Sequence, residues 1–152
     1  MKVKVMKIYL AVCCLNRPFD NQTQTRIHLE AEAILSIIQS VDDGEWEWIS
    51  SEAVAYEINR TPNEERQERL WSLESRSTKR LQLTDSILQQ ARQLQRLGFT
   101  SYDALHLTFA TAAEVDVFLT TDDKLLKRAQ GYRKEIKIPV ANPLSWLQEV
   151  MI

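Results

Sequence analysis

The chain has 152 residues, of which 44% are hydrophobic and 26% charged, and this size and balance fit one globular domain, 1–152, with a substantial core. Its 19 basic and 21 acidic residues nearly cancel, so no overall positive field attracts nucleic acid, and any such binding must be local. No stretch reaches the roughly 18 to 20 apolar residues of a membrane helix, which excludes a membrane-spanning protein.

The first predicted element is a strand over 7–14, "KIYLAVCC", whose apolar run suits a sheet covered on both faces. The segment "MKVKVMKIYLAV" has basic residues before this run, but "NRPFD" follows instead of a cleavage site, so we interpret it as a strand and not a signal peptide. Cys13 and Cys14 would point to opposite faces of the strand and cannot easily bridge. We interpret them as buried thiols of a reducing, cytoplasmic environment.

Strands and helices then alternate along the chain. The further predicted strands are 46–50, 115–121 and 136–142, the last at a sheet edge because of Pro139. The predicted helices are 25–40, 51–60, 63–78, 84–97, 101–114, 122–131 and 143–151. This order predicts an α/β fold with parallel strands joined by helical crossovers.

Three acids occupy places that packing does not readily explain. Glu57 lies near the buried side of the helix after the second strand, Asp103 opens the most apolar helix, and Asp122 directly follows the strand "VFLTT". Each alone also suits a simpler role, because acids favour helix N-termini and solvated helix faces. Together they would repel one another at one sheet edge unless a cation were present, and Mg²⁺ takes such oxygen ligands.

The segments "IYLAVCCLNRPFD", "SEAVAYEI", "YDALHLTFA" and "FLTTDDKLL" resemble the acidic motifs of PIN-domain proteins, particularly the small VapC-like toxins. The resemblance implies a three-layer α/β/α fold with a central parallel sheet of four to five strands. It also implies a Mg- or Mn-dependent endoribonuclease, the toxin of a toxin–antitoxin pair, acting on RNA as a homodimer with a cognate antitoxin. The family's motifs fall on Glu57, Asp103 and Asp122, with Thr120 as the threonine that precedes the last acid.

The first acid of that pattern falls on Ala11, where "YLD" reads "YLA". We therefore expect an impaired ribonuclease. The change is either a natural loss or a deliberate substitution, and the intact remaining motifs favour substitution. A non-catalytic PIN-like module that binds RNA or a partner protein is the alternative. A phosphate-accepting receiver domain is disfavoured, because it would need an acid pair after the first strand.

Several neighbours are weaker candidates for the site. Asp123 can assist Asp122, and Asn16 and Arg17 follow the first strand, where they can meet substrate. His106 shares a helix face with Asp103, although a core histidine bonded to backbone is the favoured interpretation. Trp46 and Trp48 share a strand face, where packing explains them better than base stacking. The apolar minority of 63–78, which is Leu70, Trp71 and Leu73, predicts a dimer contact there or on 84–97.

Overall fold

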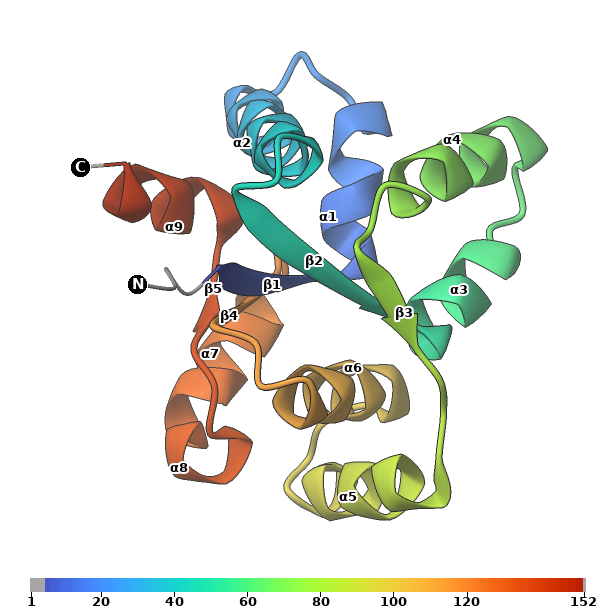
Figure 1. Cartoon of the computed structure of the whole chain (residues 1–152), viewed down its shortest axis with the longest axis vertical. Helices are drawn as coiled ribbons and strands as arrows, with labels where there is room; N and C mark the ends of the chain where they lie inside the picture. Colours follow the sequence, from blue (N-terminus) through green and yellow to red (C-terminus); the bar gives the residue numbers. More distant parts are fainter. Residues whose placement is uncertain (1–4, 152) are drawn as a thin grey trace.

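The computed structural model describes residues 5–151 and has a five-stranded sheet in which all paired strands are parallel. The strand order is β3-β2-β1-β4-β5, so β1 lies at the centre between β2 and β4 (Figure 1). The strands are β1 (Met6–Leu10), β2 (Trp46–Ser51), β3 (Lys79–Leu81), β4 (Val117–Leu119) and β5 (Val140–Ala141).

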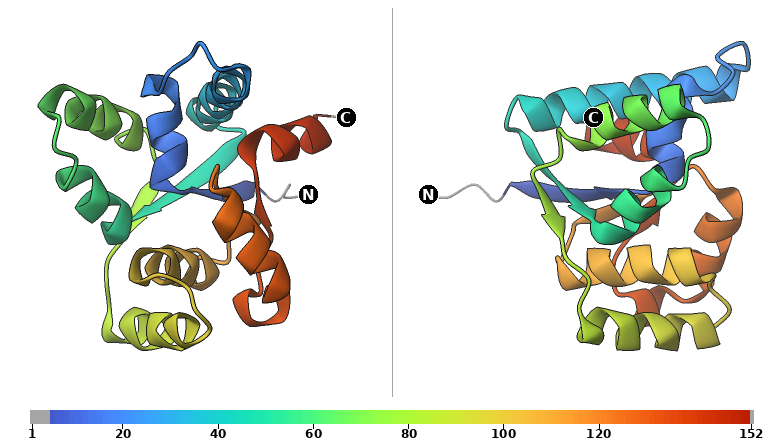
Figure 2. Two further views of the ribbon diagram at one scale, coloured as in Figure 1. Left: turned by 180° about the vertical axis from the view of Figure 1, so that it is seen from behind. Right: turned by 90° about the vertical axis from the view of Figure 1, so that its right-hand side faces the viewer.

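Helices cover both faces of this sheet, which gives the predicted three layers. Figure 2 shows α1, α2, α4 and α9 on one side and α5, α6, α7 and α8 on the other. α3 contacts both α4 and α6. The helices are α1 (Val12–Asn16), η1 (Arg17–Phe19), α2 (Thr25–Asp42), α3 (Glu52–Asn59), α4 (Glu64–Glu74), α5 (Asp85–Arg96), α6 (Ser101–Ala112), α7 (Asp123–Gly131), α8 (Arg133–Ile136) and α9 (Pro143–Val150).

The first strand is shorter than predicted, and this places the two cysteines differently. β1 ends at Leu10, and the apolar residues that follow Ala11 form the helix α1. Cys13 and Cys14 are therefore helical neighbours and not strand residues on opposite faces. Both thiols are free, Cys14 is buried and Cys13 is partly exposed.

Two of the other strands also differ from prediction. β3 was not predicted, because its three residues are largely exposed and show no apolar alternation. β5 is only two residues long and follows Pro139 at the sheet edge, as the proline predicted. Helix starts agree better, since the hydroxyls of Ser51, Thr84 and Thr100 accept backbone hydrogen bonds at the predicted N-termini.

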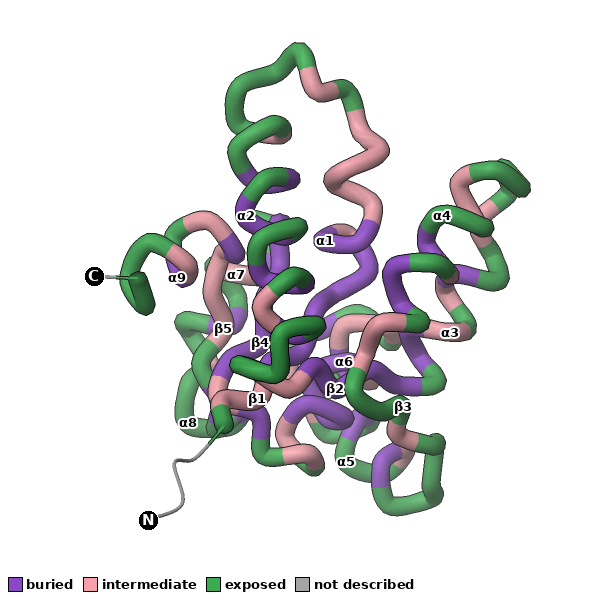
Figure 3. Tube along the Cα trace, turned by 45° about the horizontal axis from the view of Figure 1, so that its top comes forward, coloured by how far each residue is buried: buried purple, intermediate pink, exposed green. Residues whose placement is uncertain are grey.

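The core lies around the three middle strands β2, β1 and β4, which contain buried residues, shown purple in Figure 3. The edge strands β3 and β5 have no buried residue. Trp48 is fully buried, and Trp46 packs edge-on against Trp146, so both indoles act in packing. Leu70 and Leu73 are buried within the chain as well. They therefore do not supply the exposed apolar surface from which a dimer contact on 63–78 was predicted. Within residues 5–151, no helix is long and apolar enough to cross a membrane.

Candidate active site

Ala11 lies directly after β1, where the chain turns into α1. Its backbone N–H donates to the Leu119 carbonyl at 3.0 Å, so the position adjoins the end of β4. Ala11 is the N-cap residue of α1 but has no side-chain group to accept a hydrogen bond from the first turn. Only 7% of the residue is exposed. The position therefore offers a methyl group at the carboxyl edge of the central strand.

Asp122 and Thr120 follow β4 at the same edge of the sheet. Asp122 is exposed and caps α7, because its Oδ1 accepts from the N–H groups of Lys124 at 2.9 Å and Leu125 at 3.3 Å. Thr120 is fully buried, and its hydroxyl accepts from the Asp122 N–H at 3.1 Å. The threonine thus fixes the turn from which the Asp122 carboxylate projects.

Asp103 lies in the first turn of α6, behind the Thr100 cap, and is partly buried. Burial raises the pKa of its carboxyl group, and the hydrogen bond with Thr100 lowers this pKa in part. The negative charges of Asp122 and Glu57 also raise it, and the charge of His106 opposes them. Because such charge effects act over short distances, Asp122 and Glu57 lie in the neighbourhood of Asp103.

Glu57 is held by a chain of hydrogen bonds that begins in the core. The hydroxyl of Tyr9 on β1 lies 2.7 Å from Ser51 Oγ and 2.7 Å from His106 Nδ1. His106 Nε2 then contacts Glu57 Oε1 at 2.5 Å. His106 is 3% exposed, so it is a core histidine as favoured, but its partners are side chains and not backbone. This series of hydrogen bonds turns the Glu57 carboxylate toward α6.

Comparison with known protein families identifies the family of the chain. A family model described as "PIN domain" matches residues 25–131, which is more than half of the chain. The chain belongs to the PIN-domain family. No curated protein matches it. PIN domains are generally nucleases, so the family indicates a nuclease-type function. The matched range includes Glu57, Asp103 and Asp122, whereas Ala11 precedes it.

The fit of this PIN domain to a divalent metal ion is incomplete. Carboxylate oxygens are the ligands that Mg²⁺ and Mn²⁺ prefer. Within residues 5–151, however, no group of three or more histidine, cysteine, aspartate or glutamate side chains is close enough to hold a metal ion. Ala11 has no oxygen to offer, and Glu57 is turned toward His106. The donors present are thus of the right chemical type, but they do not form a complete metal centre.

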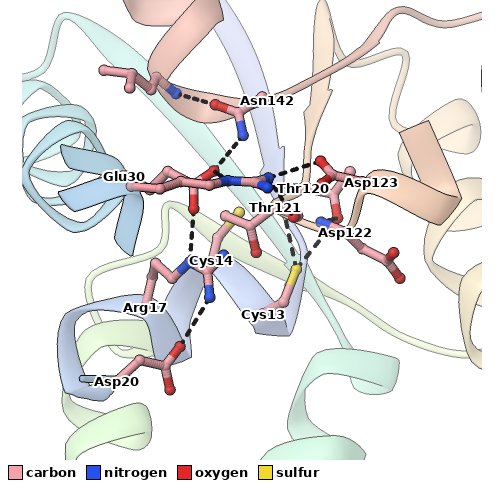
Figure 4. A network of polar contacts seen from close by, with 12 residues as sticks. Cys13, Cys14, Arg17, Asp20, Glu30, Thr120, Thr121, Asp122, Asp123 and Asn142 are labelled. Atoms are coloured by element: carbon pink, nitrogen blue, oxygen red, sulfur yellow. Dashed lines mark hydrogen bonds and ion pairs between the residues drawn. The ribbon is translucent and has the colours of Figure 1, made fainter. Parts of the chain in front are cut away.

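A second polar cluster lies beside these acids in the PIN domain (Figure 4). Its centre is Glu30 on α2, which is only 1% exposed. Glu30 accepts hydrogen bonds from Arg17 at 2.8 Å, from Arg26 at 3.3 Å and from Asn142 at 2.5 Å. Sequence reasoning missed this residue, although Glu30 falls on the apolar stripe of its helix, and a charge at such a position signals a buried partner.

The weaker candidates are engaged within the chain by these polar contacts. Asp123 forms a bidentate pair with Arg26, at 2.8 and 2.7 Å, which ties the start of α7 to α2. Arg17 is bound to Glu30 and contacts Asp20 at 3.4 Å. Asn16 accepts from Arg66 at 3.0 Å. Each of these side chains therefore has a partner that holds the loops around the acids in place.

Cys13 contacts the turn that leads to Asp122. Its Sγ lies 3.3 Å from the Thr120 hydroxyl and accepts from the Thr121 N–H at 3.4 Å. The neighbouring Cys14 thiol, followed by the hydrogen bonds from Thr120 and Thr121, lowers the pKa of Cys13 to about 6. Burial raises the pKa of Cys14 instead. Cys13 thus helps to fix the Thr120 turn that carries Asp122.

Proposed function

We propose that this PIN domain is an endoribonuclease of the VapC toxin type whose hydrolytic activity is impaired by Ala11. The observation that carries the proposal is the position of Ala11, at the carboxyl end of the central strand and beside the end of β4. The charges of Asp122 and Glu57 also act on Asp103, which supports a shared acidic region. A fourth carboxylate at position 11 would complete an acidic set of the kind that binds Mg²⁺ or Mn²⁺.

In this proposal the chain's own residues place the acids. Thr120 fixes the turn below Asp122, and His106 orients the Glu57 carboxylate. A divalent cation supplies activation of water and stabilisation of the leaving oxygen in nucleases of this kind. With an incomplete donor set, we expect this chain to bind that cation weakly. RNA is the proposed substrate, a cognate antitoxin and a second copy of the chain are the proposed partners, and the cytoplasm is the proposed location.

The decisive experiment restores the carboxylate and measures RNA cleavage with Mg²⁺ or Mn²⁺. Ala11 is an uncapped N-cap residue, so both Ala11→Asp and Ala11→Asn should improve the capping of α1 and fold normally. Only the aspartate adds an anionic ligand, which makes the asparagine variant a matched control. We expect Ala11→Asp to cleave at least ~10²–10³-fold faster than the parent chain, by analogy with other groups that stabilise charge in the transition state.

Two further results complete the test. Asp103→Asn in the Ala11→Asp background should abolish the restored cleavage, because it removes one of the acids. Equal cleavage by the parent chain and Ala11→Asp would show that position 11 takes no part in the chemistry. If Ala11→Asp stays inactive while the parent chain binds RNA, the alternative function, a non-catalytic PIN-like binding module, is the better one.

A further inference from the structure

A pair of aromatic rings, Tyr56 exposed and Tyr102 partly buried, adjoins the candidate active site. Tyr56 on α3 directly precedes Glu57, and Tyr102 on α6 directly precedes Asp103. The two rings lie 6.0 Å apart between centroids, and Tyr56 is 51% exposed. In Figure 1 the segment that joins β3 to α5 runs down the same edge of the molecule, beside α3 and α6. The same two helices therefore carry both the acids and this aromatic surface.

A hollow of about 270 Å³ lies beside these rings. It is below the roughly 300–1,000 Å³ of pockets that hold whole drug-sized ligands, so it suits a smaller flat group. Apolar side chains dominate its wall, whereas Glu52 is the one charged residue that contributes to it. The lining residues are Glu52, Ala53, Tyr56, Leu83, Tyr102, Leu105 and Phe109. A planar, uncharged ring such as a nucleobase matches this surface.

A second hollow of about 460 Å³ adjoins the first, and Glu52 and Tyr56 line both. Its other lining residues include the amide side chains of Asn59 and Gln82. Arg80 lines it as well, but its guanidinium is bound to Glu74 at 2.8 and 2.6 Å. Amides are among the side chains that hydrogen-bond the edges of bases. The two adjoining hollows, which we call the groove, thus offer rings for stacking and amides for a neighbouring nucleotide.

Arg60 lines neither hollow but places a positive charge beside Tyr56, which lines both. Its guanidinium lies 5.5 Å from the centre of the Tyr56 ring and donates to the Tyr56 hydroxyl at 2.9 Å. In the part of the chain that the structure describes, no carboxylate forms an ion pair with Arg60. An arginine that stacks on an aromatic ring and lacks an acidic partner is well suited to a phosphate group.

We propose that this groove binds single-stranded RNA, with an unpaired base on Tyr56 and Tyr102 and a backbone phosphate at Arg60. The proposal rests on the proposed function, since it names the form of RNA presented to the adjacent acids. Stacking on aromatic rings needs unpaired bases and tolerates any base. The combination of rings, amides and an unpaired cation favours RNA over an apolar segment of a protein partner, which would need only the apolar hollow.

The test measures binding of an oligoribonucleotide of roughly ten nucleotides that contains 2-aminopurine, whose fluorescence falls on stacking. The full chain with Ala11 is used with EDTA, so that cleavage does not interfere. We expect Tyr56→Ala to weaken binding roughly 5- to 100-fold and to abolish the quenching, whereas Tyr56→Phe retains both. Arg60→Ala should lower the salt dependence, log K against log salt, by roughly 0.7. Lys127→Ala is the control, because Lys127 is exposed on α7 and lines neither hollow.

Three outcomes would overturn the proposal. The first is absence of binding to the parent chain or undiminished binding to Tyr56→Ala. The second is an equal effect of Lys127→Ala, which would indicate unspecific charge attraction. The third is a change in molecular mass by light scattering in Tyr56→Ala with unchanged RNA affinity, which would make the groove a contact between copies. None of these depends on cleavage by Ala11→Asp, so failure here is distinguishable from failure of the proposed function.

Discussion

Glu30→Ala should be one of the most destabilising single substitutions among the polar residues that join α2 to the candidate site. The buried carboxylate accepts from Arg17, Arg26 and Asn142, and its loss leaves Arg17 with only the longer contact to Asp20. Removing one partner of a buried ion pair costs about 3–5 kcal/mol. The Arg17 and Arg26 side chains are 19% and 52% exposed, so water compensates in part. We therefore expect a loss near the lower limit, about 3 kcal/mol.

Thermal and urea unfolding measure this loss. For a chain of this size 1 kcal/mol corresponds to about 2–4 °C in Tm, which predicts a fall of about 6–12 °C for Glu30→Ala. Glu32→Ala is the matched control, because Glu32 is 65% exposed on the same helix and, among residues 5–151, forms an ion pair only with His28, at 4.0 Å. That change should cost less than about 1 kcal/mol. Equal effects of the two substitutions would refute the reasoning that the Glu30 cluster holds this side of the molecule together.

Two further predictions concern the acids and their support. Tyr9→Phe should lower the free energy of unfolding by about 1–3 kcal/mol in urea titration, because it removes the buried hydroxyl that contacts Ser51 Oγ and His106 Nδ1. A change within error would show that the remaining partners, the Val54 N–H for Ser51 and Glu57 for His106, suffice. Asp103→Asn should stabilise the fold at neutral pH, since the raised pKa of Asp103 means that its ionised form is disfavoured in the folded state. That gain should vanish as the pH falls below the usual aspartate pKa of about 3.9, and a gain independent of pH would contradict this origin.

The fold was largely predictable because hydrophobic periodicity and helix caps are local signals. The three-layer arrangement of helices around a parallel sheet is confirmed, and the helices predicted from 51, 84 and 101 begin at the capping hydroxyls of Ser51, Thr84 and Thr100. The run after Ala11 was assigned wrongly, since a short buried helix and a buried strand are equally apolar. β3 escaped prediction because pairing with β2, and not its own sequence, makes Lys79–Leu81 a strand.

The candidate site was also predictable only in part. Acids that follow predicted strands were identifiable, because parallel strands end at one sheet edge. The contacts of His106 with Tyr9 and Glu57 were not, since they join residues 97 and 49 positions apart. Such contacts depend on how β1, α3 and α6 pack together, and a single sequence carries no local trace of that packing. The grouping of Arg60 and Tyr56 with Tyr102 was not predictable either, because Tyr102 comes beside Tyr56 only when α3 and α6 pack together.

The central position of β1 also affects the order in which the molecule can be completed during synthesis. β1 is synthesised before both of its neighbours, and it pairs with β2 through Met6 and Trp46 and with β4 through Ile8 and Val117. One edge of β1 therefore stays open until β4 has been translated, and open strand edges invite pairing with other chains. Such distant pairings also slow folding. Because Asp122 follows β4, it can come to lie beside Ala11 only after β4 has been translated and has paired with β1.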